Sequence, residues 1–118
     1  MELKREVLGD GVLSIRVTGR VDALTASELE KEVVAVLAVP QARCVLDLAG
    51  VDYMSSAGLR VLMMGARAAA DVQGRFAVCS VQKAVYDVLV MVGFLPLIEI
   101  HENHGLAVEA ISSRPDGK

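Results

Sequence analysis

Short apolar segments of strand length alternate with longer segments of helical periodicity along nearly the whole chain. Strand patterns are predicted at residues 3–8, 12–18, 44–48, 75–79 and 97–100, and helical patterns at about 25–39, 55–72, 81–92 and 104–111. Strands that alternate with helices pair in parallel through right-handed crossovers, and the Gly9-Asp10-Gly11 turn adds an antiparallel strand at one edge. The pattern therefore predicts a single α/β domain with a mixed, mostly parallel sheet of about five strands and about four helices.

Composition limits the class of function. The chain has 118 residues, of which 53% are apolar and only 3% aromatic, and its net charge is −3. An acidic chain with few aromatic rings lacks the basic surface and the stacking platforms that nucleic-acid binding uses. We expect one core within residues 3–111 and a frayed polar tail at residues 112–118.

No apolar segment is long enough to cross a membrane. The longest uninterrupted one, Val33–Val39, is far shorter than the roughly 20 residues that a spanning helix needs. No apolar signal-peptide core follows residues 1–6, so we expect a cytoplasmic protein. Cys44 and Cys79 lie in strand-like apolar segments and are interpreted as buried, reduced thiols. A redox pair or a metal site would have no CxxC motif or neighbouring histidine to support it, so no metal or cofactor is predicted.

Three local signals indicate where elements begin and which faces they bury. Thr25-Ala26-Ser27-Glu28 is a capping box, which predicts that Thr25 caps the first helix. Ser80 is the expected cap of the third helix. In residues 12–18, Val12, Ser14, Arg16 and Thr18 alternate with Leu13, Ile15 and Val17. This alternation predicts a strand with one buried and one exposed face.

The carboxyl ends of the parallel strands are the expected place for a functional site. Two loops qualify, at residues 19–22 and 51–60. In the second, Ser55 and Ser56 stand where a strand gives way to a helix. Either serine could serve as the helix N-cap. The same position also stabilises a phosphate, because a helix N-terminus carries partial positive charge and free N–H donors.

The helix that follows has two distinct faces. Residues expected to face the sheet are Leu59, Leu62, Ala66, Ala69 and Ala70. Residues of the exposed stripe are Ser56, Arg60, Met64, Arg67 and Asp71, with Met63 at its edge. Arg60 lies one turn from Ser56 and could pair with a phosphate on it, or the two arginines could simply aid solubility. A methionine between two arginines is typical of a partner-binding surface.

Residues 45–51 (VLDLAGV) and 53–63 (YMSSAGLRVLM), together with residues 19–26 (GRVDALTA), resemble the STAS domains, the sulfate transporter and anti-sigma factor antagonist family. The resemblance extends over roughly residues 12–111 and implies a STAS-like fold. It further implies an anti-sigma factor antagonist that docks on an anti-sigma factor and thereby frees a sigma factor.

The resemblance also implies how such a protein is regulated. Ser56 would be phosphorylated by an anti-sigma factor that is also a serine kinase, and a PP2C-type phosphatase would reverse the modification. Many members carry Asp where this chain has Ser55, so Ser55 is a possible second acceptor. By the same analogy Asp22 lies beside the acceptor and helps to shape the partner surface, whereas from the residues alone it could be a loop or pre-helix hydrogen-bonding group. The partner-binding residues so predicted are Asp22, Ser55, Ser56, Arg60, Met64 and Arg67.

Three other interpretations stay open at this point. A STAS domain can also be a cytoplasmic accessory subunit of a lipid or anion transporter. An enzyme is disfavoured because the chain has no GxxxxGK[ST] phosphate loop and no GxSxG around Ser56, and His101 and His104 are interpreted as loop or capping residues. A receiver domain would use Asp47 as its phosphate acceptor, but the paired acidic residues that such domains need after the first strand are missing.

Overall fold

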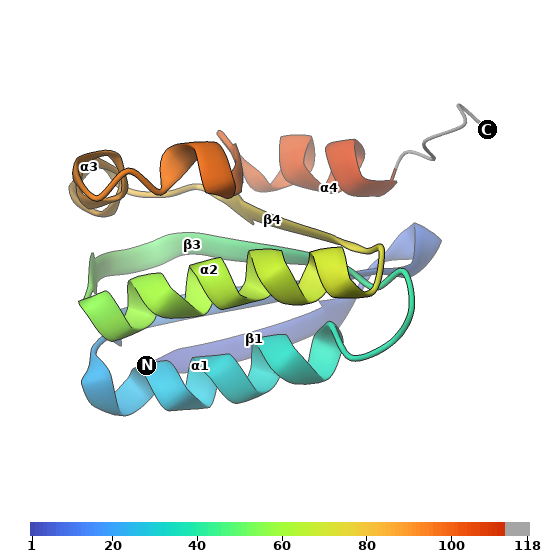
Figure 1. Cartoon of the computed structure of the whole chain (residues 1–118), viewed down its shortest axis with the longest axis horizontal. Coiled ribbons are helices and arrows are strands. Elements are labelled where there is room, and N and C mark those ends of the chain that lie inside the picture. Colours follow the sequence, from blue (N-terminus) through green and yellow to red (C-terminus); the bar gives the residue numbers. More distant parts are fainter. Residues whose placement is uncertain (113–118) are drawn as a thin grey trace.

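The computed structural model describes residues 1–112 and has the predicted alternation of strands and helices (Figure 1). In chain order the elements are β1 (Glu2–Val7), the 3-10 turn η1 (Gly9–Gly11), β2 (Val12–Val21), α1 (Ala23–Val36), β3 (Arg43–Met54), α2 (Ser56–Asp71), β4 (Arg75–Cys79), α3 (Lys83–Met91), the 3-10 turn η2 (Leu95–Leu97), β5 (Glu99–His101) and α4 (His104–Ser112). Ser112 therefore belongs to the last helix, and the rest of the tail expected to fray lies outside the described residues.

The five strands form one mixed sheet in the order β1-β2-β3-β4-β5. β1 and β2 are an antiparallel hairpin, and β2 to β5 are parallel neighbours. This arrangement confirms the predicted α/β class with a hairpin at one edge. Because each parallel strand lies next to the one before it, the carboxyl ends of β2 and β3 come together at one edge of the sheet.

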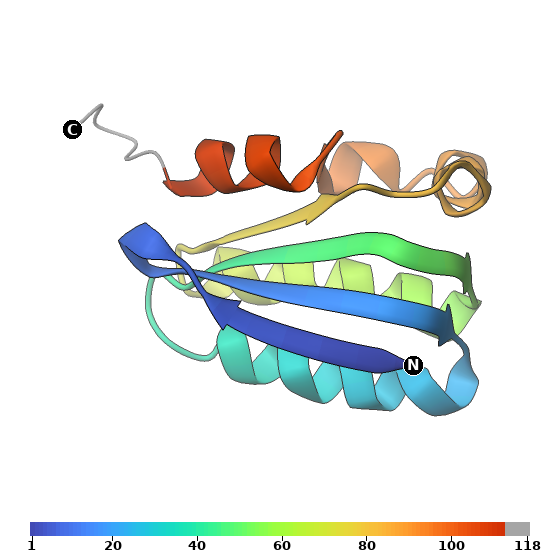
Figure 2. The ribbon, with the colours of Figure 1, turned by 180° about the vertical axis from the view of Figure 1, so that it is seen from behind.

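Helices cover both faces of the sheet. Buried residues of α1, α2 and α3, among them Leu29, Leu62 and Leu89, share the larger apolar core with one face of the strands. α4 lies on the opposite face, where Ala107 and Ile111 pack in a second, smaller core. Seen from behind, α4 stands on the near side of the sheet while α1 and α2 lie beyond it (Figure 2).

The second helical layer changes the prediction for β2. Val12 and Ser14 are completely buried, because α4 packs on their side of the sheet, whereas Arg16 and Thr18 on that same side are exposed. The alternation correctly predicted a strand, but its first half has no exposed face. Ser14 Oγ lies 2.9 Å from His104 Nε2 at the start of α4, which gives the buried hydroxyl a partner.

β3 is much longer than its apolar pattern suggested. The segment Ala49–Met54, predicted as a loop, continues the strand. β2 extends in step with it, with two register shifts before Arg20 pairs with Tyr53 and Val21 with Met54. These irregularities break the alternation of apolar and polar residues that marks a strand in a sequence.

Two residues for which the sequence suggested a role, Asp47 and Ser80, do not have that role in the structure. Asp47 lies in the middle of β3, buried, where it accepts the Ala49 N–H at 2.9 Å and pairs with Arg16 at 3.5 Å. It is therefore not a strand-end acceptor of the kind that a receiver domain uses. The predicted Ser80 cap is also wrong, because Ser80 has a left-handed φ of 58° and α3 begins later, with Gln82 as its N-cap.

Both cysteines are free and buried, as expected. Burial raises the pKa of the Cys44 thiol to about 12. Burial, helped by the nearby Asp47 carboxylate, raises that of Cys79 to about 11. Neither side chain is a thiolate near neutral pH, so both serve as small apolar core residues.

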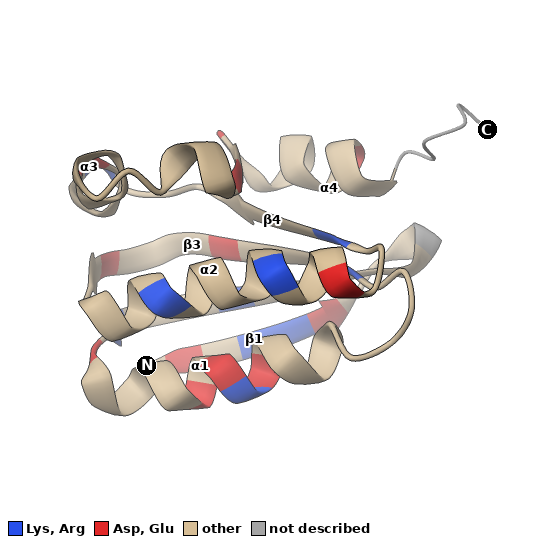
Figure 3. Ribbon diagram, in the orientation of Figure 1, with Lys and Arg blue, Asp and Glu red and all other residues tan. Residues whose placement is uncertain are grey.

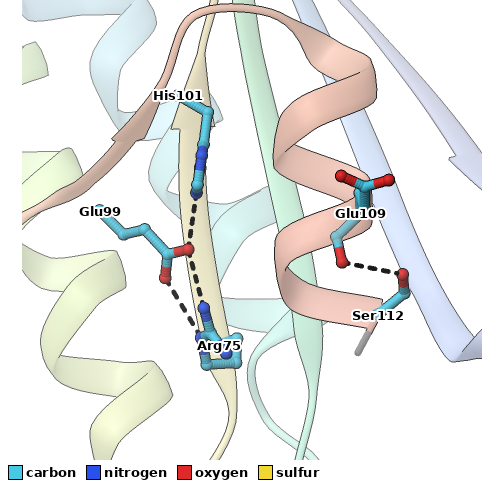
Figure 4. A network of polar contacts seen from close by, with 5 residues as sticks. All are labelled: Arg75, Glu99, His101, Glu109 and Ser112. Atoms are coloured by element: carbon cyan, nitrogen blue, oxygen red, sulfur yellow. Dashed lines mark hydrogen bonds and ion pairs between the residues drawn. The ribbon is translucent and has the colours of Figure 1, made fainter. Parts of the chain in front are cut away.

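The two histidines make separate contacts, His104 with Ser14 and His101 with Glu99. His101 on β5 contacts Glu99 at 2.7 Å, and Glu99 also receives two hydrogen bonds from Arg75, at 2.8 and 3.2 Å (Figure 4). Nearby, the Ser112 hydroxyl donates to the Glu109 carbonyl oxygen at 3.4 Å. Burial favours a higher pKa for Glu99, but hydrogen bonds from Arg75 and His101 outweigh it and hold the pKa of this carboxyl below its ordinary value.

Within residues 1–112 no group of three or more His, Cys, Asp or Glu side chains is placed to hold a metal ion.

The helices are short. The longest is α2, with 16 residues. Among the described residues, no helix combines the length and the apolar character that a membrane crossing requires.

Candidate docking site

The ends of β2 and β3 bring two helix N-termini side by side. Val21 and Met54 are partners in the parallel register, and the Ser55 N–H donates to the Val21 carbonyl oxygen at 2.8 Å. α1 begins two residues after Val21 and α2 two residues after Met54, at the same edge of the sheet (Figure 1). Two sets of first-turn N–H groups, which have no carbonyl partner within their own helix, and two positive ends of helix dipoles are therefore next to each other.

A glycine makes this close approach possible. A Cβ on Gly58, in the first turn of α2, would lie 2.5 Å from Met54 Cγ and 2.8 Å from Val21 Cγ1. Gly58 is buried between the helix and the ends of the two strands. The glycine of the Ser-Ser-Ala-Gly segment is thus required by packing, and it sets how far α2 stands from the sheet.

The two serines at the start of α2 have different environments. Ser55 is the N-cap, and its half-buried hydroxyl accepts the Gly58 N–H at 3.3 Å. Ser56 is the first residue of the helix and is exposed. Its hydroxyl makes no hydrogen bond to any described residue. Of the two hydroxyls, only that of Ser56 is both accessible and free to react.

Asp22 is the N-cap of α1, so this helix begins earlier than predicted. One carboxylate oxygen, Oδ1, accepts the N–H groups of Leu24 and Thr25, each at 3.0 Å. Thr25 returns a hydrogen bond, because its Oγ1 accepts the Asp22 N–H at 2.8 Å. This Asp22–Thr25 capping box replaces the predicted one, which had Thr25 as the cap. Asp combines an N-cap oxygen with a negative charge at the positive end of the helix, an advantage that a Thr cap lacks.

The hydrogen bonds from the Thr25 backbone and hydroxyl hold the pKa of Asp22 below its ordinary value of 3.8. The stabilisation from the ionised carboxylate is therefore present above that value and is lost as the pH falls through the lower pKa of the folded protein.

We predict that Asp22→Ala lowers the melting temperature by a few degrees at pH 7, whereas Asp22→Asn keeps most of the cap. Thermal melts from pH 7 to pH 2 check this. An Asp22→Asn melting temperature that declines below pH 4 as steeply as the wild type would contradict the assignment.

The outer face of α2 is exposed as predicted, except at Met64. Arg60, Arg67 and Asp71 are exposed, and Met63 and Met64 are half-buried against the core. In Figure 3 the basic segments of α2 lie on the viewer's side, next to acidic segments of α1. Within residues 1–112, neither Arg60 nor Arg67 forms an ion pair. On the inner face, Leu59, Leu62 and Ala69 are buried as predicted, but Ala70 is exposed.

Three further exposed residues surround the site and were not predicted. Leu24, in the first turn of α1, is 87% exposed, and Tyr53 at the end of β3 is 41% exposed. The Arg20 guanidinium stacks on the Tyr53 ring, 4.2 Å from its centroid. Leu24 was overlooked because the helix start was placed after it. A large apolar side chain two residues after an Asp cap is the signal that would have identified it.

The chain matches a known protein family over most of its length. The model of the family described as "Mlab, STAS domain" matches residues 6–99. The chain belongs to the STAS-domain family. It is 35% identical over 104 residues, 88% of this chain and 90% of the relative, to BtrV of Bordetella bronchiseptica, which is named as an anti-sigma factor antagonist.

Solved structures of similar proteins have the same fold as this STAS domain. An anti-sigma factor antagonist from Mycobacterium paratuberculosis is 28% identical, with a TM-score of 0.81 over 93% of this chain and 92% of that one. An anti-sigma factor antagonist from Thermotoga maritima has a TM-score of 0.84 over 92% of this chain and 93% of that one. At 20% identity this second likeness shows the fold alone. The fold predicted from the resemblance is thereby confirmed.

Proposed function

We propose that this STAS domain is an anti-sigma factor antagonist, a non-enzymatic protein switch controlled by phosphorylation of Ser56. When Ser56 is unmodified, the surface around the two helix N-termini docks on an anti-sigma factor and releases the sigma factor. The observation that carries the proposal is the Ser56 hydroxyl, exposed at the first position of α2 and hydrogen-bonded to no described residue. The anti-sigma factor antagonist names of its relatives support the choice of partner.

The phosphate is compatible with the fold. It adds about −1.5 to −2 charges, which the N-terminus of α2 stabilises. Arg60 lies four residues after Ser56 on the same face, within reach of an ion pair with the phosphate. The modification therefore leaves the helix in place, and its effect is felt by whatever binds to this surface.

A docked partner, in contrast, is displaced. A dianion inside a fitted interface must lose water, and it repels acidic groups of the partner. A loss of a few kcal/mol lowers affinity by about a hundredfold or more. The anti-sigma factor is itself the serine kinase, which transfers the γ-phosphoryl group of ATP to the Ser56 hydroxyl and releases ADP. A PP2C-type phosphatase hydrolyses the phosphoserine and restores the docking form.

Ser56 is favoured over Ser55 as the acceptor. The Ser55 hydroxyl already caps α2 through the Gly58 N–H, so modifying it would disturb the helix start. Asp22 acts mainly on shape, because one of its carboxylate oxygens caps α1 and so fixes the first turn of this helix. That turn carries the exposed Leu24 at the same edge of the sheet as Ser56.

We predict that Ser56→Glu lowers affinity for the anti-sigma factor by about a hundredfold, while Ser56→Ala binds as the wild type does. The reason is that glutamate, like the phosphate, places a negative charge inside the interface, while alanine removes only the hydroxyl. Titration calorimetry with the anti-sigma factor of the same genome measures both, and mass spectrometry locates the phosphate after incubation with that protein and ATP.

Gln41→Glu is the matched control, because Gln41 is exposed in the turn after α1, at the other end of the two helices from Ser56, and the same charge is added there. Equal affinities for the wild type and Ser56→Glu, with no phosphate on Ser56, would overturn the proposal. Copurification of unmodified protein with a membrane ATPase would instead identify a transporter subunit.

A further inference from the structure

A groove runs between α1 and α2, beyond the serine. Its volume is about 300 Å³, and it is lined by Glu30 from α1 and by Arg60, Met63, Met64 and Arg67 from α2. Arg60 is also the residue one turn from Ser56, so the groove continues the proposed docking surface along the helix. Its size suits one or two side chains of a partner.

The floor and the rim of the groove differ in chemistry. Met63 and Met64 form an apolar floor and pack against the core with one side. Methionine adapts its shape to what it contacts, and this makes it common at protein-binding surfaces. Arg60 and Arg67 are exposed on the rim and form no ion pair with any described residue, so both guanidinium groups are available.

We propose that this groove binds a segment of the anti-sigma factor that carries a carboxylate next to an apolar side chain. The inference rests on the function proposed above and names the chemistry of the partner. The apolar side chain fills the space above the two methionines. The carboxylate pairs with Arg67 or Arg60, whose planar guanidinium groups bind carboxylates through two parallel hydrogen bonds.

Glu30 sets the orientation of the bound segment. It is exposed on the α1 wall and has no basic partner among the described residues. A carboxylate on that side of the groove would be repelled, while one on the α2 side is attracted. A segment inserted the other way round therefore loses the attraction and meets repulsion, which is how charge patterns select a register.

The test compares two charge reversals of equal size. Arg67→Glu is expected to lower affinity for the anti-sigma factor at least tenfold at low salt, and the loss should shrink as salt rises. Lys31→Glu, an exposed control on α1 outside the groove, is expected to stay within twofold of the wild type. Met64→Gln should weaken binding with little salt dependence. Equal affinities for Arg67→Glu and Lys31→Glu would overturn the inference.

A direct measurement separates this inference from the proposed function. Labelled methionine methyl signals of Met63 and Met64 should shift when the anti-sigma factor is added, and revert when Ser56 is phosphorylated. If phosphorylation abolishes binding but these signals never move, the groove assignment fails while the switch stands. If phosphorylation leaves binding unchanged, the switch itself fails. Signals that move with the concentration of this chain alone would show that a second copy fills the groove, and would also overturn the inference.

Discussion

Replacing Gly58 by valine is expected to lower the free energy of unfolding by about 2 to 3 kcal/mol, the usual cost of overpacking a tight site. For a domain of this size the melting temperature falls by roughly 10 °C. The reason is the space between α2 and the strand ends, where even a Cβ would lie 2.5 Å from Met54 Cγ and 2.8 Å from Val21 Cγ1. Valine adds two methyl groups in the same direction, and the helix must move away from the sheet.

Gly105→Val is the matched control. Gly105 lies in the first turn of α4, where the nearest atom to a new Cβ is Asn103 Oδ1 at 3.5 Å, an ordinary contact. Thermal and denaturant unfolding of both variants measure the difference. Similar stability of the two variants would show that the Gly58 contact relaxes without cost.

The same substitution has a consequence for docking. Ser55 depends on the Gly58 N–H for its cap, and Ser56 starts the helix whose position Gly58 sets. A helix displaced at its first turn presents the Ser56 hydroxyl in a different place relative to Leu24. The less severe Gly58→Ala variant should therefore lose less stability than Gly58→Val, but it should still bind the anti-sigma factor more weakly than the wild type.

The sequence predicted those parts of the fold in which one local signal dominates. β4 was predicted with its observed bounds, because four apolar residues follow Arg75 between the turn residues Gly74 and Ser80. The start of α2 at Ser55–Ser56 followed from capping chemistry that is local to a few residues. The Ser56 stripe followed from helical periodicity, which is equally local.

The predictions of strand length and burial failed where the structure of a segment depends on an element distant in the sequence. The continuation of β3 through Ala49–Met54 depends on pairing with β2 across register shifts, which an alternating pattern does not contain. Burial of Val12 and Ser14 depends on α4, which comes some ninety residues later in the chain. The start of α1 was placed three residues too late because Thr25 also fits the rule for an N-cap, and only the carboxylate geometry of Asp22 separates the two.

The Ser14–His104 contact is expected to be a strong tie between α4 and the sheet. Ser14 is 0% exposed, and its hydroxyl meets His104 Nε2 at 2.9 Å. His104→Leu leaves that hydroxyl buried without a partner, at a cost of about 2 kcal/mol. Ser14→Ala removes the polar atom itself, so it should cost less, about 1 kcal/mol, since the half-buried His104 can turn to water.

A double-mutant cycle separates the hydrogen bond from the packing around it. With both partners replaced, no buried polar group is left unsatisfied, so Ser14→Ala/His104→Leu should be more stable than His104→Leu alone. Denaturant unfolding of the four proteins gives the coupling energy, and hydrogen exchange of α4 amides shows whether the helix loosens locally. Additive losses in the cycle would mean that water reaches Ser14 once the imidazole is gone, and that α4 is held by Ala107 and Ile111 instead.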